Sequence, residues 1–190
     1  MNKVIILGCN GGIGSELVDV FINNDYAVYP VNKNTIDLKF KNSKQKLNQL
    51  LKETDPDIII NATGLFGNNK IDFNNIFNIN VRSNWNIINY YKHNPNKIVK
   101  FIMLGSSSYN GPRKNYILYT ATKCALHSIF ESTKELFQDT NLKIGIVHPK
   151  RTKTKMLSSI KKDDLNPEYV AEEIFNFVKN MDKSSYKIIE

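Results

Sequence analysis

Near its start the chain reads Val4-Ile5-Ile6-Leu7-Gly8-Cys9-Asn10-Gly11-Gly12-Ile13-Gly14, and this segment indicates the fold most directly. Its four leading apolar residues predict a short, buried strand. The glycines that follow allow a sharp turn in which the backbone can approach a phosphate group closely. A helical pattern then begins, so free backbone N–H groups and the positive end of a helix would face that anion. A glycine-rich turn without any ligand is the alternative, but the position directly after the first strand favours a nucleotide.

Apolar runs alternate with helical patterns along the rest of the chain. The predicted strands are 4–7, 27–31, 57–61, 98–104, 143–147 and 186–189, and the predicted helices are 13–23, 43–54, 76–91, 119–137 and 167–180. This alternation is typical of a mostly parallel sheet with helices on both faces. Between Val31 and Thr35 there is no room for a crossover helix, so either that helix is lost or Thr35–Leu38 is loop. We predict one α/β domain over residues 1–190, with a Rossmann-like, doubly wound sheet.

Composition narrows the function classes. The 190 residues, 41% of them hydrophobic, suit one domain with a real core. No apolar run approaches the roughly 18 residues that cross a bilayer, and the first run ends too early for a signal peptide, so we expect a cytoplasmic protein without membrane contact. Two cysteines form no disulfide framework or metal-type spacing. The net charge of +8 comes from scattered lysines without a binding motif, so we expect no nucleic-acid partner.

A second signal lies downstream, in Gly105-Ser106-Ser107-Ser108 and in Tyr119-Thr120-Ala121-Thr122-Lys123. Tyr119 and Lys123 are four residues apart and share one face of a helix. A tyrosine with a pKa of about 10 is a poor base at neutral pH, but a neighbouring ammonium lowers that pKa. Alone, such a pair is usually one turn of an amphipathic helix. Together with the serines and the glycine turn it favours an active site.

These features resemble the short-chain dehydrogenase/reductase (SDR) family over nearly the whole chain. The spacing of Gly8, Gly12 and Gly14 matches that family's GxxxGxG turn, and Tyr119 and Lys123 match its catalytic pair. Four further stretches match its motifs in order: Asp37-Leu38 the pair at the adenine, Asn61-Ala62-Thr63-Gly64 the NNAG element, Asn80-Val81 the NV pair, and Pro149 to Thr154 the PGxxxT element.

The resemblance implies roles for these residues. Tyr119 would be the general acid/base, Lys123 would tune it and bind the ribose, and Asn80 would hold a water of the proton relay. Ser106, thirteen positions before Tyr119, would orient the carbonyl, with Ser107 and Ser108 as alternatives. The implied cofactor-binding residues are Gly8, Asn10, Gly11, Gly12, Ile13, Gly14, Asn32, Lys33, Asp37, Leu38, Asn61, Ala62, Thr63, Gly64, Tyr119, Lys123, Pro149, Thr152 and Thr154.

The choice of cofactor depends on the end of the second strand. NAD enzymes of this type place an acidic residue there for the ribose hydroxyls, and this chain has none. Asn32 and Lys33 would instead meet a 2′-phosphate, so NADP is favoured, with NAD possible. The chain departs from the family at Lys150, where PGxxxT has glycine. It also has little sequence after Met156 to build a substrate lid, so the site is expected to be open or completed by a partner subunit.

The predicted function is reversible hydride transfer between NADP(H) and a small carbonyl or alcohol. The alternatives are a non-catalytic nucleotide-binding regulator or scaffold, and a nucleotide-sugar epimerase or dehydratase. In the family the helices equivalent to 76–91 and 119–137 pair across a two-fold axis, so a homodimer or homotetramer is expected, with Trp85, Ile88, Leu126 and Phe130 contributing apolar surface. Three other side chains receive structural readings: His127 as packing, His148 as lining the cofactor cleft, and Cys124 as a small buried residue. Trp85 has two alternative readings, core on its helix or part of this apolar surface.

Overall fold

The computed structural model describes residues 1–94, 97–111, 113–157 and 159–190. Six strands form one sheet in the order β2-β1-β3-β4-β5-β6, and all five pairings are parallel. The strands are β1 (Lys3–Leu7), β2 (Ala27–Val31), β3 (Ile58–Asn61), β4 (Val99–Leu104), β5 (Leu142–Pro149) and β6 (Ser185–Ile189). The order reverses direction at β1, as in doubly wound folds, and the predicted fold class is confirmed.

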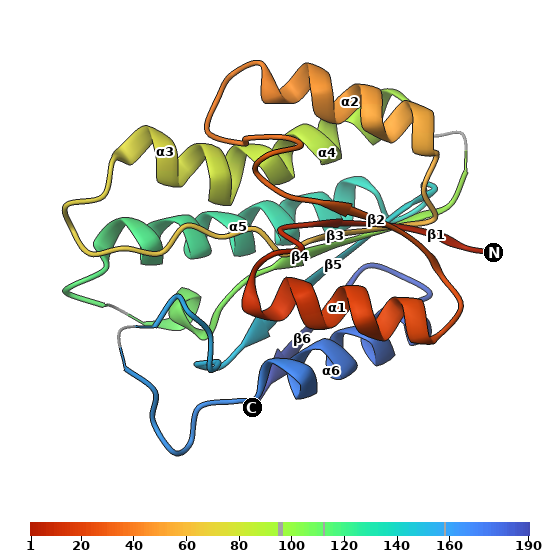
Figure 1. The fold of residues 1–190 in the computed structure, drawn as a ribbon. Coiled ribbons are helices and arrows are strands. Elements are labelled where there is room, and N and C mark those ends of the chain that lie inside the picture. Colours follow the sequence, from red (N-terminus) through yellow and green to blue (C-terminus); the bar gives the residue numbers. More distant parts are fainter. Residues whose placement is uncertain (95–96, 112, 158) are drawn as a thin grey trace.

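Helices cover both faces of the sheet (Figure 1). They are α1 (Gly12–Asn23), α2 (Ser43–Thr54), α3 (Phe73–Phe77), the π-helix η1 (Asn78–Arg82), α4 (Ser83–His93), the 3₁₀ turn η2 (Ser107–Asn110), α5 (Ile117–Leu136) and α6 (Pro167–Asn180). Helices α1 and α6 lie on one face, and α2, α4 and α5 lie on the other. Each face has its own core cluster, because strands between two helical layers bury side chains in both directions.

Two helical predictions need correction. The helix expected over 76–91 begins at Phe73 and is interrupted by η1, so it is three consecutive segments rather than one regular helix. Such π turns are frequent at functional sites, and this one contains Asn80. Serine is a favoured N-cap residue, so the sequence predicts Ser43 as the N-cap of the helix over 43–54. In the structure Ser43 is instead the buried first residue of α2, and the N-cap is Asn42.

The segment Thr35–Leu38 is loop, which settles the alternative left open by the sequence. Strand β2 is the edge of the sheet, and the chain runs from it through this loop directly into α2. An edge strand tolerates Pro30, which cannot donate to a neighbouring strand. Ile36 and Leu38 are buried in the core cluster on the α2 side, so the loop fills space without adding a strand.

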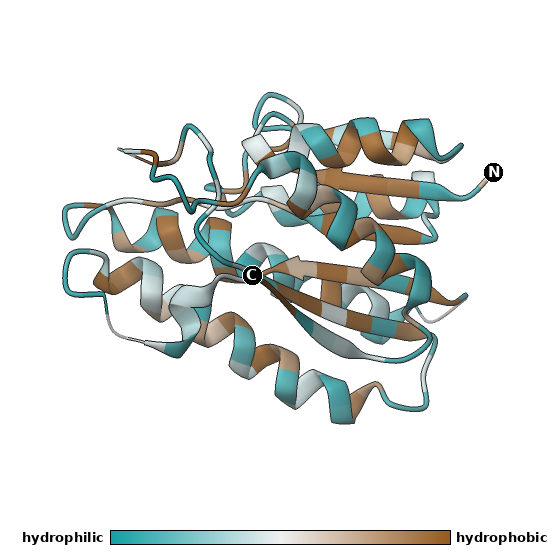
Figure 2. Cartoon of the chain, turned by 90° about the horizontal axis from the view of Figure 1, so that it is seen from below, coloured by the Kyte–Doolittle hydropathy of each residue, from teal (hydrophilic) through white to brown (hydrophobic). Residues whose placement is uncertain are grey.

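The strands are mostly hydrophobic, and the helices alternate hydrophobic with hydrophilic residues (Figure 2). Ile88, Leu126 and Phe130 are at most 1% exposed, so the expectation that they form apolar surface is wrong. Trp85 is 46% exposed, so its reading as surface is correct and its reading as core is wrong, and Cys124, expected to be buried, is exposed. A helical wheel gives the direction of each side chain but not which neighbouring helix covers it. Among the helices of the described residues, none is long and apolar enough to cross a membrane.

Candidate active site

A pocket of about 900 Å³ opens at the carboxyl ends of the strands, where parallel α/β sheets bind ligands. The turns after β1, β3, β4 and β5 all contribute to it. Its lining residues are Asn10–Ser15, Ala62–Phe66, Leu104–Ser108, Arg113, Tyr116, Tyr119, Lys123, Pro149–Thr152, Thr154–Leu157 and Lys161. Four segments that are far apart in the sequence therefore meet at one site.

The turn after β1 is built for close backbone approach. Gly8 has φ +84°, a conformation that favours glycine, and its N–H donates to Val31 O at 2.8 Å. A Cβ on Gly14 would lie 2.1 Å from Gly8 O, and one on Gly12 would lie 2.6 Å from Thr154 Cγ2. Helix α1 starts after Gly11 with no side-chain cap and no acidic residue in its first turn. The first-turn N–H groups therefore remain for an anion, so this cradle fits the pyrophosphate of a dinucleotide.

Tyr119 and Lys123 lie on α5 and face the pocket together with Ser106 at the end of β4. Burial raises the pKa of Tyr119, and a hydrogen bond with the Ser106 side chain opposes this rise. The Lys123 side chain is buried, and its ammonium donates to Leu104 O at 2.7 Å and lies 5.6 Å from the centre of the Tyr119 ring. Burial lowers the pKa of Lys123 to about 8. The three side chains thus form one contact group around the phenol.

Asn80 and Asn61 lie behind the pocket and do not line it. The Asn80 amide accepts from Leu65 N–H at 2.7 Å, donates to Leu65 O at 3.0 Å and donates to Thr122 Oγ1 at 3.0 Å. Asn61 donates to Ser83 Oγ and to Asn84 Oδ1, both at 3.0 Å. These hydrogen bonds are all with other groups of the protein, so both asparagines position the loop after β3 beside Tyr119.

Sequence reasoning missed a histidine pair behind Ser106. His148 is fully buried on β5, and its Nδ1 accepts from Ser106 N–H at 3.2 Å. Its Nε2 lies 3.2 Å from His127 Nδ1, and the Tyr109 ring stacks on it at 4.0 Å. Burial, with His127 beside it, lowers the pKa of His148 to about 4, so the ring is neutral near pH 7. His148 supports the Ser106 backbone and does not line the pocket, contrary to the expectation for the cleft.

The predicted adenine-end residues lie beside the pocket rather than in its lining. Asn32 directly follows Val31, the residue bonded to Gly8, and its side chain accepts from Asn34 N–H at 2.8 Å. Lys33 is exposed. Asp37 accepts from Lys39 N–H at 3.0 Å, and Leu38 is buried in the core. The end of β2 therefore borders the phosphate turn, but Asp37 is engaged in its own turn and Leu38 in packing.

The described residues of the β5–α6 loop, 150–157 and 159–166, line part of the pocket. The pocket lining includes the predicted residues Pro149, Thr152 and Thr154. It also includes Met156, Leu157 and Lys161, so this loop contributes more to the pocket than the sequence led us to expect. The Arg151 guanidinium pairs with Asp164 at 2.8 Å, and backbone bonds between residues 151, 153 and 165 close the base of the loop. An Arg151–Asp164 ion pair was not foreseeable, because the partners are thirteen positions apart in a loop without a regular period.

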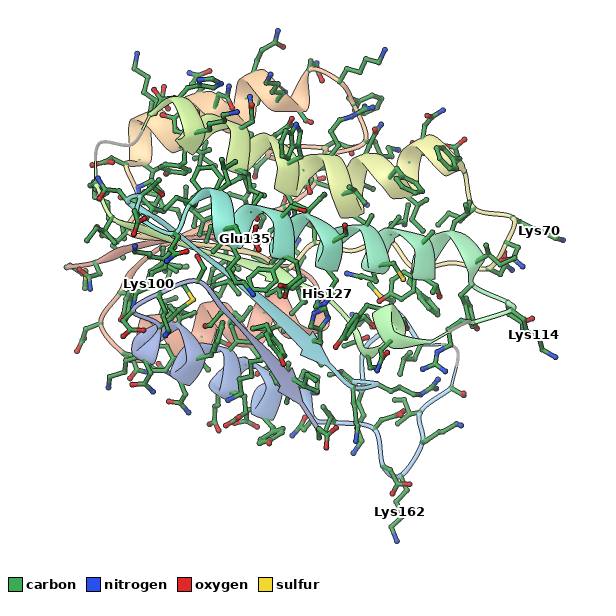
Figure 3. All side chains as sticks on the ribbon, turned by 180° about the vertical axis from the view of Figure 1, so that it is seen from behind. Lys70, Lys100, Lys114, His127, Glu135 and Lys162 are labelled. Carbon is green, nitrogen blue, oxygen red and sulfur yellow. The ribbon has the colours of Figure 1, made fainter. Side chains whose placement is uncertain are left out.

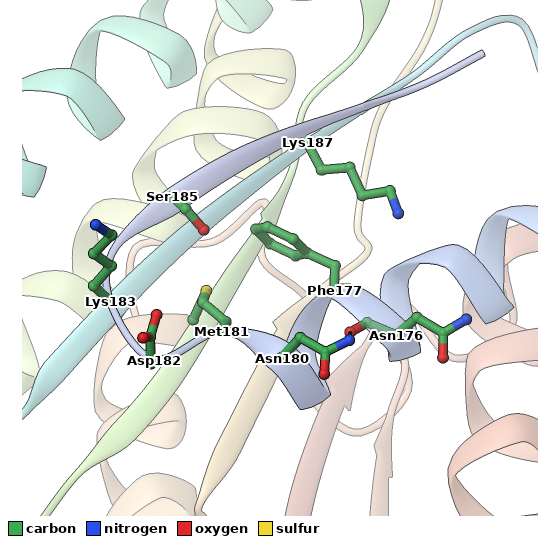
Figure 4. A pocket seen from close by; sticks show the side chains of 8 residues that line it. All are labelled: Asn176, Phe177, Asn180, Met181, Asp182, Lys183, Ser185 and Lys187. Atoms are coloured by element: carbon green, nitrogen blue, oxygen red, sulfur yellow. Dashed lines mark hydrogen bonds between the residues drawn. The ribbon is translucent and has the colours of Figure 1, made fainter.

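A second hollow lies between the end of α6 and the start of β6, lined by Asn176, Phe177, Asn180, Met181, Asp182, Lys183, Ser185 and Lys187 (Figure 4). The connection from α6 to β6 runs at the amino ends of the strands, opposite the larger pocket. It offers no group comparable to the Tyr119, Lys123 and Ser106 cluster. We therefore place the candidate active site at the carboxyl ends.

The fold and this site define a dinucleotide-binding α/β protein of the SDR type. A model of the NAD-dependent epimerase/dehydratase family matches residues 4–146, most of the chain, and the chain belongs to this family. A curated relative, the bifunctional ribulose 5-phosphate reductase/CDP-ribitol pyrophosphorylase of Haemophilus influenzae, is 25% identical over 163 residues, which are 80% of this chain and 34% of that protein. The chain thus spans about a third of the length of this relative.

Solved structures share the fold at low sequence identity. A 4-hydroxyisoleucine dehydrogenase complexed with NADH superposes with a TM-score of 0.87 at 18% identity, covering 100% of this chain and 97% of that one. A 3-ketoacyl-(acyl-carrier-protein) reductase from Brucella melitensis, complexed with NADH, gives 0.82 at 17% identity over 99% and 96%. A short-chain dehydrogenase from Burkholderia cenocepacia in complex with NADP gives 0.84 at 15% identity over 100% and 96%.

Proposed function

We propose that the chain catalyses hydride transfer between NADP(H) and a small carbonyl or alcohol compound. The observation that carries the proposal is the group of half-buried Tyr119 and Ser106 with buried Lys123, which lies beside a glycine cradle in one pocket. A nucleotide-binding scaffold would need the cradle but not a lysine buried next to a tyrosine, because burying an ammonium costs stability. When bound, the nicotinamide cofactor supplies or accepts the hydride.

The residues of this chain would move and hold the proton. In the reduction, the Tyr119 hydroxyl donates its proton to the carbonyl oxygen as the carbonyl carbon receives the hydride, and the product is the alcohol. In the oxidation the phenolate accepts the hydroxyl proton. Charged Lys123 stabilises that phenolate, and Ser106 orients the substrate oxygen next to Tyr119. Asn80 and His148 act as positioning residues through Leu65 and Ser106.

Tyr119→Phe tests the chemistry, because it removes only the hydroxyl. Turnover of a reactive diketone such as butane-2,3-dione should fall about a hundredfold to ten-thousandfold, the usual contribution of a general acid/base, while the dissociation constant for NADPH stays close to that of the parent protein. Ser106→Ala should lower turnover as well, and Ser107→Ala is its matched control. Wild-type turnover in Tyr119→Phe would show that the catalytic group lies elsewhere.

We propose a preference for NADPH over NADH. No acidic residue follows β2, and exposed Lys33 is available for a 2′-phosphate beside the phosphate turn. Calorimetric titration should give a smaller dissociation constant for NADPH, and Lys33→Ala should remove most of the difference. Lys41→Ala, an exposed lysine further along the same loop, is the control. Equal affinities in the wild type, or a preference for NADH that survives Lys33→Ala, would rule the assignment out.

The name of the matching family keeps epimerase or dehydratase activity on a nucleotide sugar as a second candidate. The two reactions differ in cofactor balance. A reductase consumes one NADPH for each carbonyl reduced, whereas an epimerase returns the hydride and shows no net consumption. Monitoring NADPH absorbance and product stereochemistry with both substrate classes separates them. The reductase half of the curated relative, whose name gives ribulose 5-phosphate as substrate, supports the reductase and makes a phosphorylated ketose a substrate to test.

Assembly and compartment are also proposals. We propose a homodimer or homotetramer formed through α4 and α5, where Trp85 is exposed. The cytoplasm is the compartment that we propose, because it supplies reduced nicotinamide cofactor and suits two free cysteines.

A further inference from the structure

The charge of the active-site pocket is one-sided. Among the described residues that line it, the charged ones are all lysines or arginines, namely Arg113, Lys123, Lys150, Arg151, Lys155 and Lys161. The whole chain, by comparison, has 18 acidic residues against 26 basic ones. A pocket lined by one sign of charge concentrates ligands of the opposite sign.

Some of these cations are already neutralised or occupied. Arg151 pairs with Asp164 at 2.8 Å, Lys150 pairs with Glu190 at 3.3 Å, and the Lys123 ammonium donates to Leu104 O. Lys155 follows Thr154, whose side chain packs against Gly12, so we assign it to the phosphate turn of the cofactor. Arg113 and Lys161 remain, and neither has an ion-pair partner among the residues that the structure describes.

Arg113 belongs to the Tyr119 end of the pocket. Its carbonyl accepts from Tyr116 N–H at 2.9 Å, the Tyr116 ring stacks on Phe66 at 4.5 Å, and Phe66 meets the Tyr119 ring edge-on at 4.8 Å. An aromatic wall therefore connects this arginine to the proposed acid/base. A dinucleotide with its phosphates at the start of α1 would leave Arg113 for the other reactant.

Lys161 is held at the pocket by the β5–α6 loop. Its backbone N–H donates to Asp164 Oδ2 at 2.7 Å, and the other oxygen of the same carboxylate pairs with Arg151. Asp164 is almost fully buried, so this clasp fixes where the loop presents Lys161. The next residue, Lys162, points away from the body of the protein, as does Lys114, the neighbour of Arg113 (Figure 3). Arg113 and Lys161 thus each have a sequence neighbour of the same charge that points outward and can serve as a control.

We propose that Arg113 and Lys161 form an anion-binding subsite and that the carbonyl substrate carries a phosphomonoester. A phosphomonoester has a charge of about −1.5 to −2 near pH 7 and oxygens that a guanidinium can bind bidentately, so it suits two uncompensated cations better than a neutral ligand does. The subsite would hold the substrate by its charged end while Ser106 and Tyr119 meet the carbonyl. This inference rests on the proposed function, because it concerns the substrate of the same pocket.

The first test compares ribulose 5-phosphate with ribulose, which differs only in the phosphate, and with pyruvate, which carries a carboxylate. The wild type should prefer ribulose 5-phosphate over ribulose in kcat/KM by at least about tenfold, since hydrogen bonds to charged groups contribute that much or more. In the double variant Arg113→Gln/Lys161→Gln this ratio should collapse by about ten- to hundredfold, mainly through KM. The control Lys114→Gln/Lys162→Gln should retain the wild-type ratio.

The second test does not depend on turnover. Calorimetry of the protein saturated with NADP⁺ should detect binding of ribulose 5-phosphate, weakened at least tenfold in the Arg113→Gln/Lys161→Gln variant but not in the control pair. If butane-2,3-dione is reduced through Tyr119 while ribulose and ribulose 5-phosphate are used equally, the subsite is wrong and the proposed function stands. A preference for pyruvate that depends on the two cations would replace the phosphomonoester with a carboxylate. If no carbonyl is reduced, the proposed function fails, and the calorimetric comparison still decides the subsite.

Discussion

Lys123→Met measures how much the buried Lys123 ammonium lowers the free energy of unfolding. Lys123 is 3% exposed, its ammonium donates to the neutral Leu104 carbonyl, and burial lowers its pKa from 10.5 to about 8. A fall of that size corresponds to about 3 kcal/mol by which the charged form is less favourable in the folded state than in the unfolded state. The folded protein bears this cost wherever the lysine is protonated in both states.

The sign follows from proton binding. Between pH 8 and pH 10.5 the unfolded chain holds a proton on Lys123 that the folded chain has released, so wild-type stability rises with pH in this window. The methionine variant lacks this contribution. The free energy of unfolding of Lys123→Met minus that of the wild type should therefore be constant below pH 8 and decrease by about 3 kcal/mol as the pH rises through 10.5. The lost bond to Leu104 O adds an offset but does not create the slope.

Urea denaturation of both proteins without cofactor, followed by circular dichroism from pH 6 to pH 11, measures this difference. Lys134→Met is the matched control, because Lys134 lies on the same helix, is 41% exposed and pairs with Glu131 at 2.8 Å. Its stability difference should stay within about 0.5 kcal/mol of zero over the same range, as for exposed ion pairs. A difference for Lys123→Met that does not change with pH, or that grows as the pH rises, would refute the reasoning.

Three further predictions concern other parts of the molecule. Gly14→Ala should weaken NADPH binding in calorimetry and cost about 1–3 kcal/mol in urea denaturation, because its Cβ would lie 2.1 Å from Gly8 O; unchanged binding would contradict the cradle. Because burial lowers the pKa of His148 to about 4, the wild type should lose stability relative to His148→Phe as the pH falls from 6.5 towards 4, and parallel stability curves would contradict this. Trp85→Glu should convert the proposed oligomer to monomers in analytical ultracentrifugation; a wild type that is already monomeric would exclude that assembly.

The fold could be predicted because its determinants are local. The apolar run before Gly8, the glycine turn and the alternation of strands with helices specify a parallel sheet without reference to distant residues. One of the two alternatives for Thr35–Leu38, that it is loop, was also correct, since the chain there is too short for a crossover helix. The wrong predictions concern which side chains are covered when helices and strands pack together. Ile88, Leu126 and Phe130 were expected on the surface, yet other helices and the sheet cover them, and Trp85 was left outside.

In the candidate site, too, the local features could be predicted from the sequence and the contacts between elements could not. The glycine turn and the Tyr119–Lys123 pair each lie within one short segment, so the sequence could single them out by their combination and by the family resemblance, and the structure places them in one pocket. The hydrogen bond between His148 and Ser106 could not be predicted from spacing. His148 is 42 positions away and lies on β5, the strand that pairs with β4. The π turn η1 was missed for another reason. One extra residue in a helical turn leaves the apolar period nearly unchanged, and yet it accompanies the inward placement of Asn80 against Leu65.

In the proposed enzyme the cofactor half and the substrate half of the pocket depend on different parts of the structure. The cofactor half of the pocket depends on backbone geometry at Gly8–Gly14, which leaves little freedom for change, since each added Cβ meets another atom of the protein. The proposed substrate half depends on two exposed side chains from separate loops, Arg113 beside Tyr116 and Lys161 on the loop that Asp164 holds. Substitutions in those loops alter charge and shape without disturbing the sheet. Substrate choice can therefore change while hydride transfer at Tyr119 is kept, so the substrate must be inferred from the charges that the loops bring together and not from the motifs.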